Sequence, residues 1–128
     1  MVWRLAGGLV HMRDQVNRKY PTRNKASDGT IGDRAHMARA SDHNVRGGIV
    51  HALDLTHDPV RFDAHAFAER LRQSRDPRIK YIISNRRIAS SKDNWGWRKY
   101  GGSNPHSSHI HVSIKDNPHA DNKKDWPV

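Results

Sequence analysis

The chain has 128 residues, no cysteine and a formal net charge of +10, from 23 Lys and Arg against 13 Asp and Glu. This length fits one domain with a modest core, and we expect a single domain over residues 1–128. The lack of cysteine excludes disulfide bonds and thiolate metal sites, so any metal site must use His and carboxylate side chains. The positive charge favours anionic partners without choosing among them.

Two segments show the apolar spacing of amphipathic helices. The stripe of the first consists of Leu5, Leu9, Met12 and Val16, and Pro21 ends the helix. The second helix starts at Asp63, and its apolar face consists of Ala64, Phe67, Ala68 and Leu71. Between them, residues 21–48 are polar and rich in glycine. A connection of this length in a compact domain is typical of a functional loop.

Strand patterns occupy the second half of the chain. Residues 49–56 and 79–84 are expected to form buried strands, residues 87–89 begin a third, and residues 109–114 alternate as a fourth. We expect residues 90–107 to be loop and the tail from residue 115 to be polar, with a late Trp126. Helices packed on a small antiparallel or mixed sheet make the expected fold α+β.

The segment His109-Ile110-His111 is the sharpest local feature. Side chains two positions apart on a strand point to the same face, so both imidazoles project together while Ile110 and Val112 face the core. Two surface histidines can also share this spacing by chance. The histidine pair therefore indicates a site only if partners elsewhere in the chain join it.

Asp54 interrupts the apolar strand 49–56. A buried carboxylate is costly unless it is paired, and the partner is either a metal ion or one of the basic side chains. His51 lies three positions away and so faces the other side of the strand. His43, in the loop before the strand, could join Asp54 and His111. Two histidines and one carboxylate are the donor set of a catalytic zinc site with an open fourth position.

These residues carry a resemblance to a known family. Ser41-x-His43, then Ala52-x-Asp54 in a strand, then His109-x-His111 resemble the D-Ala-D-Ala carboxypeptidase, lysostaphin and hedgehog-type zinc peptidases. The chain is similar in particular to small phage-encoded peptidoglycan peptidases, over residues 14–114. The resemblance implies a hedgehog/DD-peptidase-like fold and Zn²⁺ held by His43, Asp54 and His111. It also implies that His109 acts near the metal as acid/base or oxyanion stabiliser.

The chain departs from the family pattern at two places. Ten residues separate His43 from Asp54, a longer stretch than the carboxypeptidase pattern has. Many relatives place an acidic base three residues before the last ligand, where this chain has Ser108. Its only glutamate is Glu69, on the expected second helix and better suited to pair with a neighbouring arginine. The proton-transfer role therefore passes to His109.

Further candidates would bind substrate: Arg39, Arg87, Trp97 and His106. The arginines could hold a peptide carboxylate, because guanidinium groups bind carboxylates bidentately. Trp97 could form a wall for stem peptide or sugar, although core packing is an equal alternative. His106 is a weaker candidate for proton transfer, against a role in ordering its loop.

The resemblance predicts hydrolysis of an amide bond in a peptidoglycan stem peptide or cross-bridge, without indicating which bond. We expect peptidoglycan as partner, with anionic wall or outer-membrane polymers in addition, no nucleic acid, and a monomer. The first twelve residues lack the apolar core of a signal peptide. We therefore expect synthesis in the host cytoplasm and action at the cell wall or periplasm after holin-type release.

Two other function classes remain open. The His-hydrophobic-His pattern is also typical of DNA-nicking nucleases, which need a nucleophilic tyrosine. Tyr20, Tyr81 and Tyr100 all precede the histidine pair, which disfavours the order of replication initiators and leaves the relaxase order open through Tyr20. The third class is a non-catalytic module that binds cell wall or nucleic acid. Such a module would bind no zinc at the predicted ligands.

Overall fold

The computed structural model describes residues 3–30, 43–102 and 106–128. The fold is α+β, as the sequence predicts. The elements are β1 Arg4–Leu5, α1 Gly7–Lys19, β2 Ile49–Val50, β3 Ala52–Thr56, α3 Ala64–Ser74, β4 Ile79–Ser84, β5 Arg87–Ser90, a 3-10 turn at Ser91–Asp93, β6 Arg98–Lys99, β7 His109–Ile114 and the 3-10 turn η2 Pro118–Asp121. No helix within these ranges is long and apolar enough to cross a bilayer.

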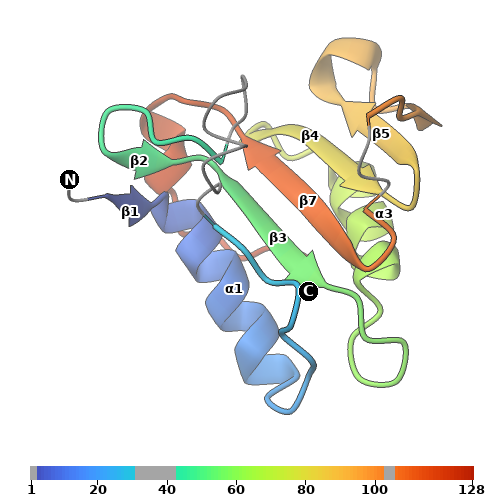
Figure 1. Cartoon of the computed structure of the whole chain (residues 1–128). Helices are drawn as coiled ribbons and strands as arrows, with labels where there is room; N and C mark the ends of the chain where they lie inside the picture. Colours follow the sequence, from blue (N-terminus) through green and yellow to red (C-terminus); the bar gives the residue numbers. More distant parts are fainter. Residues whose placement is uncertain (1–2, 31–42, 103–105) are drawn as a thin grey trace.

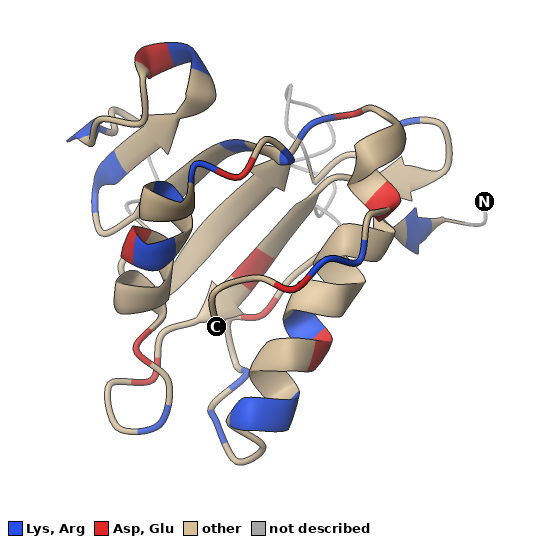
Figure 2. Ribbon diagram, turned by 180° about the vertical axis from the view of Figure 1, so that it is seen from behind, with Lys and Arg blue, Asp and Glu red and all other residues tan. Residues whose placement is uncertain are grey.

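Among the described residues, the main sheet has five antiparallel strands in the order β3-β7-β4-β5-β6. Both α1 and α3 lie on one of its faces (Figures 1 and 2). The core between helices and sheet contains Leu9, Met12 and Val16 of α1, Phe67 and Leu71 of α3, and Leu53, Leu55, Ile110 and Val112 of the sheet, all nearly inaccessible to solvent. The opposite face of the sheet is therefore free to carry polar side chains.

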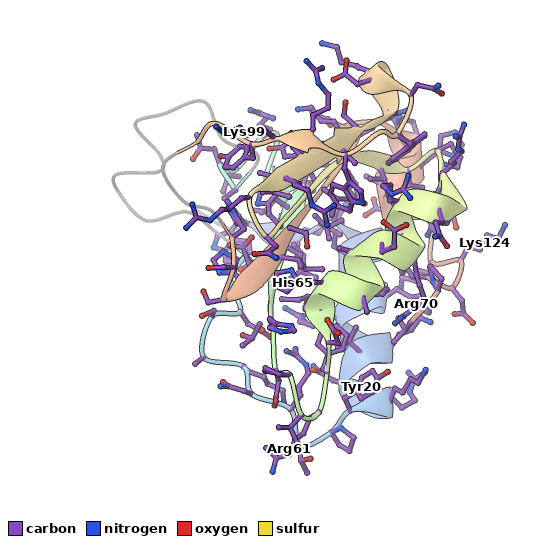
Figure 3. All side chains as sticks on the ribbon, turned by 90° about the vertical axis from the view of Figure 1, so that its right-hand side faces the viewer. Tyr20, Arg61, His65, Arg70, Lys99 and Lys124 are labelled. Carbon is purple, nitrogen blue, oxygen red and sulfur yellow. The ribbon has the colours of Figure 1, made fainter. Side chains whose placement is uncertain are left out.

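The expected strand 49–56 is divided at His51. Residues Ile49–Val50 pair in parallel with β1, whereas Ala52–Thr56 pair with β7 in the main sheet. The prediction of one continuous strand is therefore wrong, because the chain changes pairing partner at this point. The expected loop 90–107 also contains β6, a short strand at the outer edge of the sheet, where Lys99 lies (Figure 3).

The first helix begins later than its apolar stripe suggests, whereas the second begins where the sequence predicts. Leu5, placed in the first helical stripe, lies in β1, and α1 begins at Gly7. The N-terminus of α3 is as predicted: the Asp63 carboxylate accepts a hydrogen bond from the Ala66 amide at 3.0 Å and caps the helix. The tail is not merely polar, because Trp126 is buried and donates its indole N–H to the Gly8 carbonyl at 2.9 Å.

Candidate metal centre

Asp54 and His111 lie opposite each other in the register of β3 and β7. Directly opposed residues of antiparallel strands project on the same face with their Cβ atoms about 4.5–5.5 Å apart. The face is the one that α1 and α3 leave uncovered. Asp54 Oδ1 lies 3.1 Å from His111 Nδ1. The sheet therefore brings together two predicted ligands that are 57 residues apart in the chain.

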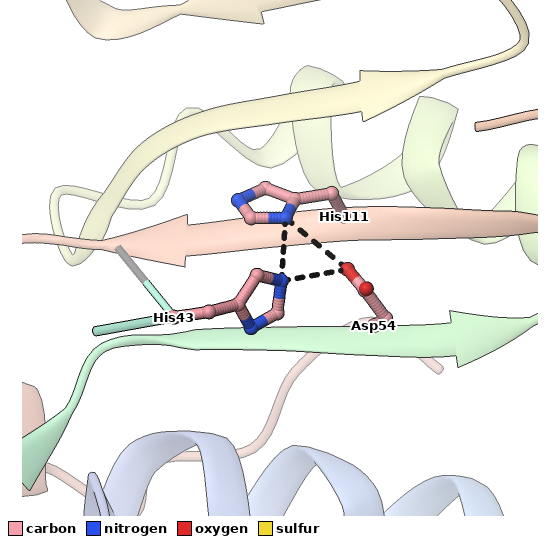
Figure 4. A group of neighbouring side chains, drawn as sticks. All are labelled: His43, Asp54 and His111. Atoms are coloured by element: carbon pink, nitrogen blue, oxygen red, sulfur yellow. Dashed lines mark hydrogen bonds and ion pairs between the residues drawn. The ribbon is translucent and has the colours of Figure 1, made fainter. Parts of the chain in front are cut away.

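His43 completes the group from the segment that leads into β2. Its Nε2 lies 3.2 Å from Asp54 Oδ1 and 3.1 Å from His111 Nδ1 (Figure 4). The three atoms form a nearly equilateral triangle, and both imidazoles are buried. We name His43, Asp54 and His111 the central triad. The structure thus places together the three residues that the sequence predicts as ligands, and they could hold a metal ion.

The hydrogen bonds around the central triad direct lone pairs to its centre. His43 Nδ1 lies 2.7 Å from the Thr30 carbonyl oxygen. A carbonyl can only accept, so Nδ1 donates and Nε2 of the neutral ring carries a lone pair. His111 Nε2 lies 2.7 Å from Ser113 Oγ, which can accept its N–H and leave the Nδ1 lone pair facing the triad. Such outer partners fix the tautomers of metal-binding histidines.

The dimensions of the central triad fit a tetrahedral transition metal. Zinc bound at its usual ligand distances of about 2.0–2.1 Å places neighbouring ligand atoms about 3.3 Å apart. The observed edges of 3.1, 3.1 and 3.2 Å are within a few tenths of that length. Two imidazoles and one carboxylate also suit zinc chemically.

Electrostatics keep Asp54 ionised. Burial opposes ionisation, but when His111 and His43 carry protons on the nitrogens that face Asp54, their hydrogen bonds and charge outweigh burial and hold the pKa of the Asp54 carboxyl below its usual range. The carboxylate is therefore negatively charged at neutral pH. A cation that takes the place of these protons would meet the same negative charge and the lone pairs of both rings.

His109 and His106 lie beside the central triad. His109 Nε2 is 3.5 Å from Asp54 Oδ2, the carboxylate oxygen that does not contact His111. Burial lowers the pKa of His109, although the nearby charge of Asp54 raises it in part. The His106 ring meets the His109 ring edge-on, with 4.8 Å between centroids. The predicted acid/base residue and His106 therefore both face the carboxylate.

Sequence reasoning missed Tyr81, whose ring stacks on His111 with 5.3 Å between centroids and 9° between planes. A register shift between Ile79 and Tyr81 in β4 places Ile79 opposite Ile114 on the core side and Tyr81 opposite Ser113 on the triad side. Such bulges redirect side chains, and strict alternation cannot anticipate them. Ser113 could have been found, because it continues the alternation of His109 and His111.

The remaining predicted residues lie elsewhere. The guanidinium of Arg87 sits 4.9 Å from the centroid of Trp97, whose indole N–H donates to Glu69 of α3 at 2.7 Å. Glu69 also pairs with Arg72, as the sequence suggested. Arg87 and Trp97 thus pack toward α3, on the helix side of the sheet. Arg39 lies outside the described residues.

His51 is separated from the central triad. It is buried, and its Nε2 lies 3.3 Å from Asp116 Oδ1, two residues beyond the end of β7. The sequence-based expectation that His51 faces away from Asp54 agrees with this partner.

Comparisons of the chain with protein-family models, with curated proteins and with solved structures gave no match. The family resemblance therefore remains a prediction that rests on the motif residues and on the geometry of the central triad.

Proposed function

We propose that the protein is a zinc-dependent peptidoglycan peptidase of the hedgehog/DD-peptidase-like group. The observation that carries this proposal is the convergence of His43 Nε2, Asp54 Oδ1 and His111 Nδ1 within 3.2 Å of one another, beside an additional histidine, His109. Three protein ligands leave a fourth position open, which distinguishes catalytic from structural zinc sites.

His43, Asp54 and His111 would hold the zinc ion, which when bound would supply Lewis-acid chemistry and make water a better nucleophile near neutral pH. His109 supplies the proton chemistry. Its pKa is lowered by burial, so its ring is neutral at pH 7 and Nε2 can take a proton from water. The same atom can then deliver the proton to the leaving amine. Thr30 and Ser113 hold the rings of His43 and His111 in place.

The net charge of +10 supports a polyanionic substrate network. The proposal includes peptidoglycan and anionic wall or outer-membrane polymers as partners, and action at the cell wall after holin-type release. Whether the bond cut is a cross-link or a terminal peptide bond follows from the fragment masses in the experiment below.

The decisive experiment uses purified peptidoglycan, zinc and two chains, wild type and His111→Ala. We expect wild type to release new amino groups, with fragment masses that identify the bond, and His111→Ala to release none. His119→Gln is the control, because His119 is exposed and outside the central triad. Absence of new amino groups with zinc-loaded wild type contradicts the peptidase, and new reducing sugar ends indicate a glycosidase instead.

A DNA-nicking nuclease remains as second candidate, because Tyr81 stacks on His111. In that reaction a tyrosine attacks a phosphate beside a metal ion. Conversion of supercoiled plasmid to nicked circles by wild type, lost in Tyr81→Phe, would favour the nuclease. We expect no nicking, because the nuclease reading gives no role to His43 and Asp54, which complete the central triad.

A further inference from the structure

A second group of metal-binding side chains overlaps the central triad. Asp54, His106 and His109 each offer one ligand atom, and these atoms lie within 4.8 Å of one another. The two groups use opposite sides of one carboxylate: Oδ1 contacts His43 and His111, whereas Oδ2 lies nearest His109. We infer that Asp54, His106 and His109 form a second position for a transition-metal cation, bridged to the first by the Asp54 carboxylate.

The strongest support is an unsatisfied atom. His109 is only 9% exposed, and its buried Nε2 has no hydrogen-bond partner among the described residues. Its Nδ1 lies 3.2 Å from Ser108 Oγ, so the Nε2 side of the ring faces Asp54 without a satisfied contact. Burying a polar atom without a partner lowers the stability of the fold. A cation between His109 and Asp54 would remove that cost.

His106 is held at the same place by contacts on its other sides. Its carbonyl accepts a hydrogen bond from the Asn85 amide at 3.1 Å, and its ring meets Tyr100 edge-on at 5.8 Å. Its backbone has φ +54°, in the left-handed region that a residue with a side chain adopts at a cost. This conformation presents the imidazole, which is 8% exposed, to His109.

The two positions differ in the expected strength of binding. Tetrahedral ligand atoms lie about 3.3 Å apart, and the central triad already has edges of 3.1–3.2 Å. The second group is wider, with His109 Nε2 3.5 Å from Asp54 Oδ2, and its side chains must rotate inward to close on an ion. The central triad therefore fills first and the second position at higher metal concentration.

A cation at the second position would occupy His109 Nε2, the atom that the proposed reaction uses for proton transfer. This consequence rests on the proposed function, and it makes excess zinc an inhibitor. The binding inference itself does not depend on peptidase activity.

The test counts zinc in the metal-stripped full chain by calorimetric titration and by native mass spectrometry at neutral pH. We expect wild type to bind one tight and one weaker equivalent. His106→Asn, which tolerates the left-handed backbone, and His109→Gln should each lose only the weaker equivalent. His119→Gln should keep both. Circular dichroism of each variant verifies that it is folded.

Two results overturn the inference: a wild-type chain that takes up a single equivalent at millimolar zinc, or weaker binding that persists unchanged in both His106→Asn and His109→Gln. If the central triad does not bind zinc, a different result is expected. His43→Gln would then keep the tight zinc equivalent, whatever the His106 and His109 variants show.

Discussion

Ser113 is a fully buried serine whose Oγ lies 2.7 Å from His111 Nε2, the ring nitrogen that faces away from the central triad. Outer partners of this kind change metal affinity by about 10- to 100-fold when removed. We predict a loss of zinc affinity in this range for Ser113→Ala, measured by competition with a chromophoric chelator. Ser84→Ala is the matched control, because Ser84 is also buried and bonds a histidine, His65, outside the triad. Equal zinc affinity of Ser113→Ala and wild type would contradict the orienting role.

We expect the pH dependence of the proposed reaction to follow His109. Burial lowers its pKa below the ordinary histidine value of about 6.5, and a bound cation would lower it further because it repels the imidazolium form. Only the neutral ring can accept a proton. We therefore predict that kcat/KM stays high above this pKa and falls as the pH falls through it, with the midpoint below 6.5. His109→Ala should lose this acidic limb and about 10²–10⁴-fold in rate. An acidic limb that persists in this variant would assign the titration to another group.

The residues of the site were predicted with unequal success. Asp54, His109 and His111 could be found because strand alternation fixes which side chains share a face. His43 could be proposed only by completing a donor set, since nothing local distinguishes one loop histidine from another. Thr30 contributes a backbone carbonyl, which every residue has, and Tyr81 reaches the site through a register shift. Neither the role of the Thr30 carbonyl nor the position of Tyr81 can be recognised from the sequence.

At the scale of elements, the packing of α1 on η2 explains a glycine that weakens helix formation. A Cβ on Gly8 would lie 2.9 Å from the Ala120 carbonyl oxygen and 3.0 Å from that of Asn122. We predict that Gly8→Ala lowers the free energy of unfolding, because overpacking costs about 1–3 kcal/mol and alanine gains only about 1 kcal/mol in helix propensity. Thermal unfolding measures the effect.

The control for this substitution is Asp14→Ala, which also raises helix propensity on α1 but at an exposed position. It should not lower the melting temperature. A Gly8→Ala chain more stable than wild type would show that helix propensity outweighs the close approach of the two segments.

The elements themselves were largely predictable where periodicity is strong. The apolar faces of α1 and α3 and the alternation of β7 have the expected periods. Periodicity does not say where a strand changes partner, which is why the break at His51 was missed. The short strands β1 and β6 have two residues each, too few for a repeating pattern.

For the whole molecule, metal binding should be linked to folding stability. A ligand that binds only the folded chain adds about 2.7 kcal/mol at a free concentration 100 times its Kd. We predict that zinc raises the melting temperature of the metal-stripped protein by roughly 10 °C under these conditions. Asp54→Asn removes the negative charge at the centre of the site, so this variant should show little of the rise. The control variant His119→Gln should show the full rise. A full rise in Asp54→Asn would place the stabilising zinc elsewhere.

The position of Asp54 within the backbone ladder has a kinetic consequence. Its strand is bonded on one side to β7 and on the other to Gly29, with Asp54 N–H donating to the Gly29 carbonyl at 2.8 Å. Asp54 and His111 therefore sit where amide hydrogen exchange should be slowest. His43 comes from a turn outside this ladder. If the central triad binds an ion, two of its three ligands therefore come from the most protected part of the backbone, whereas His43 is held by its turn and by its bond to Thr30.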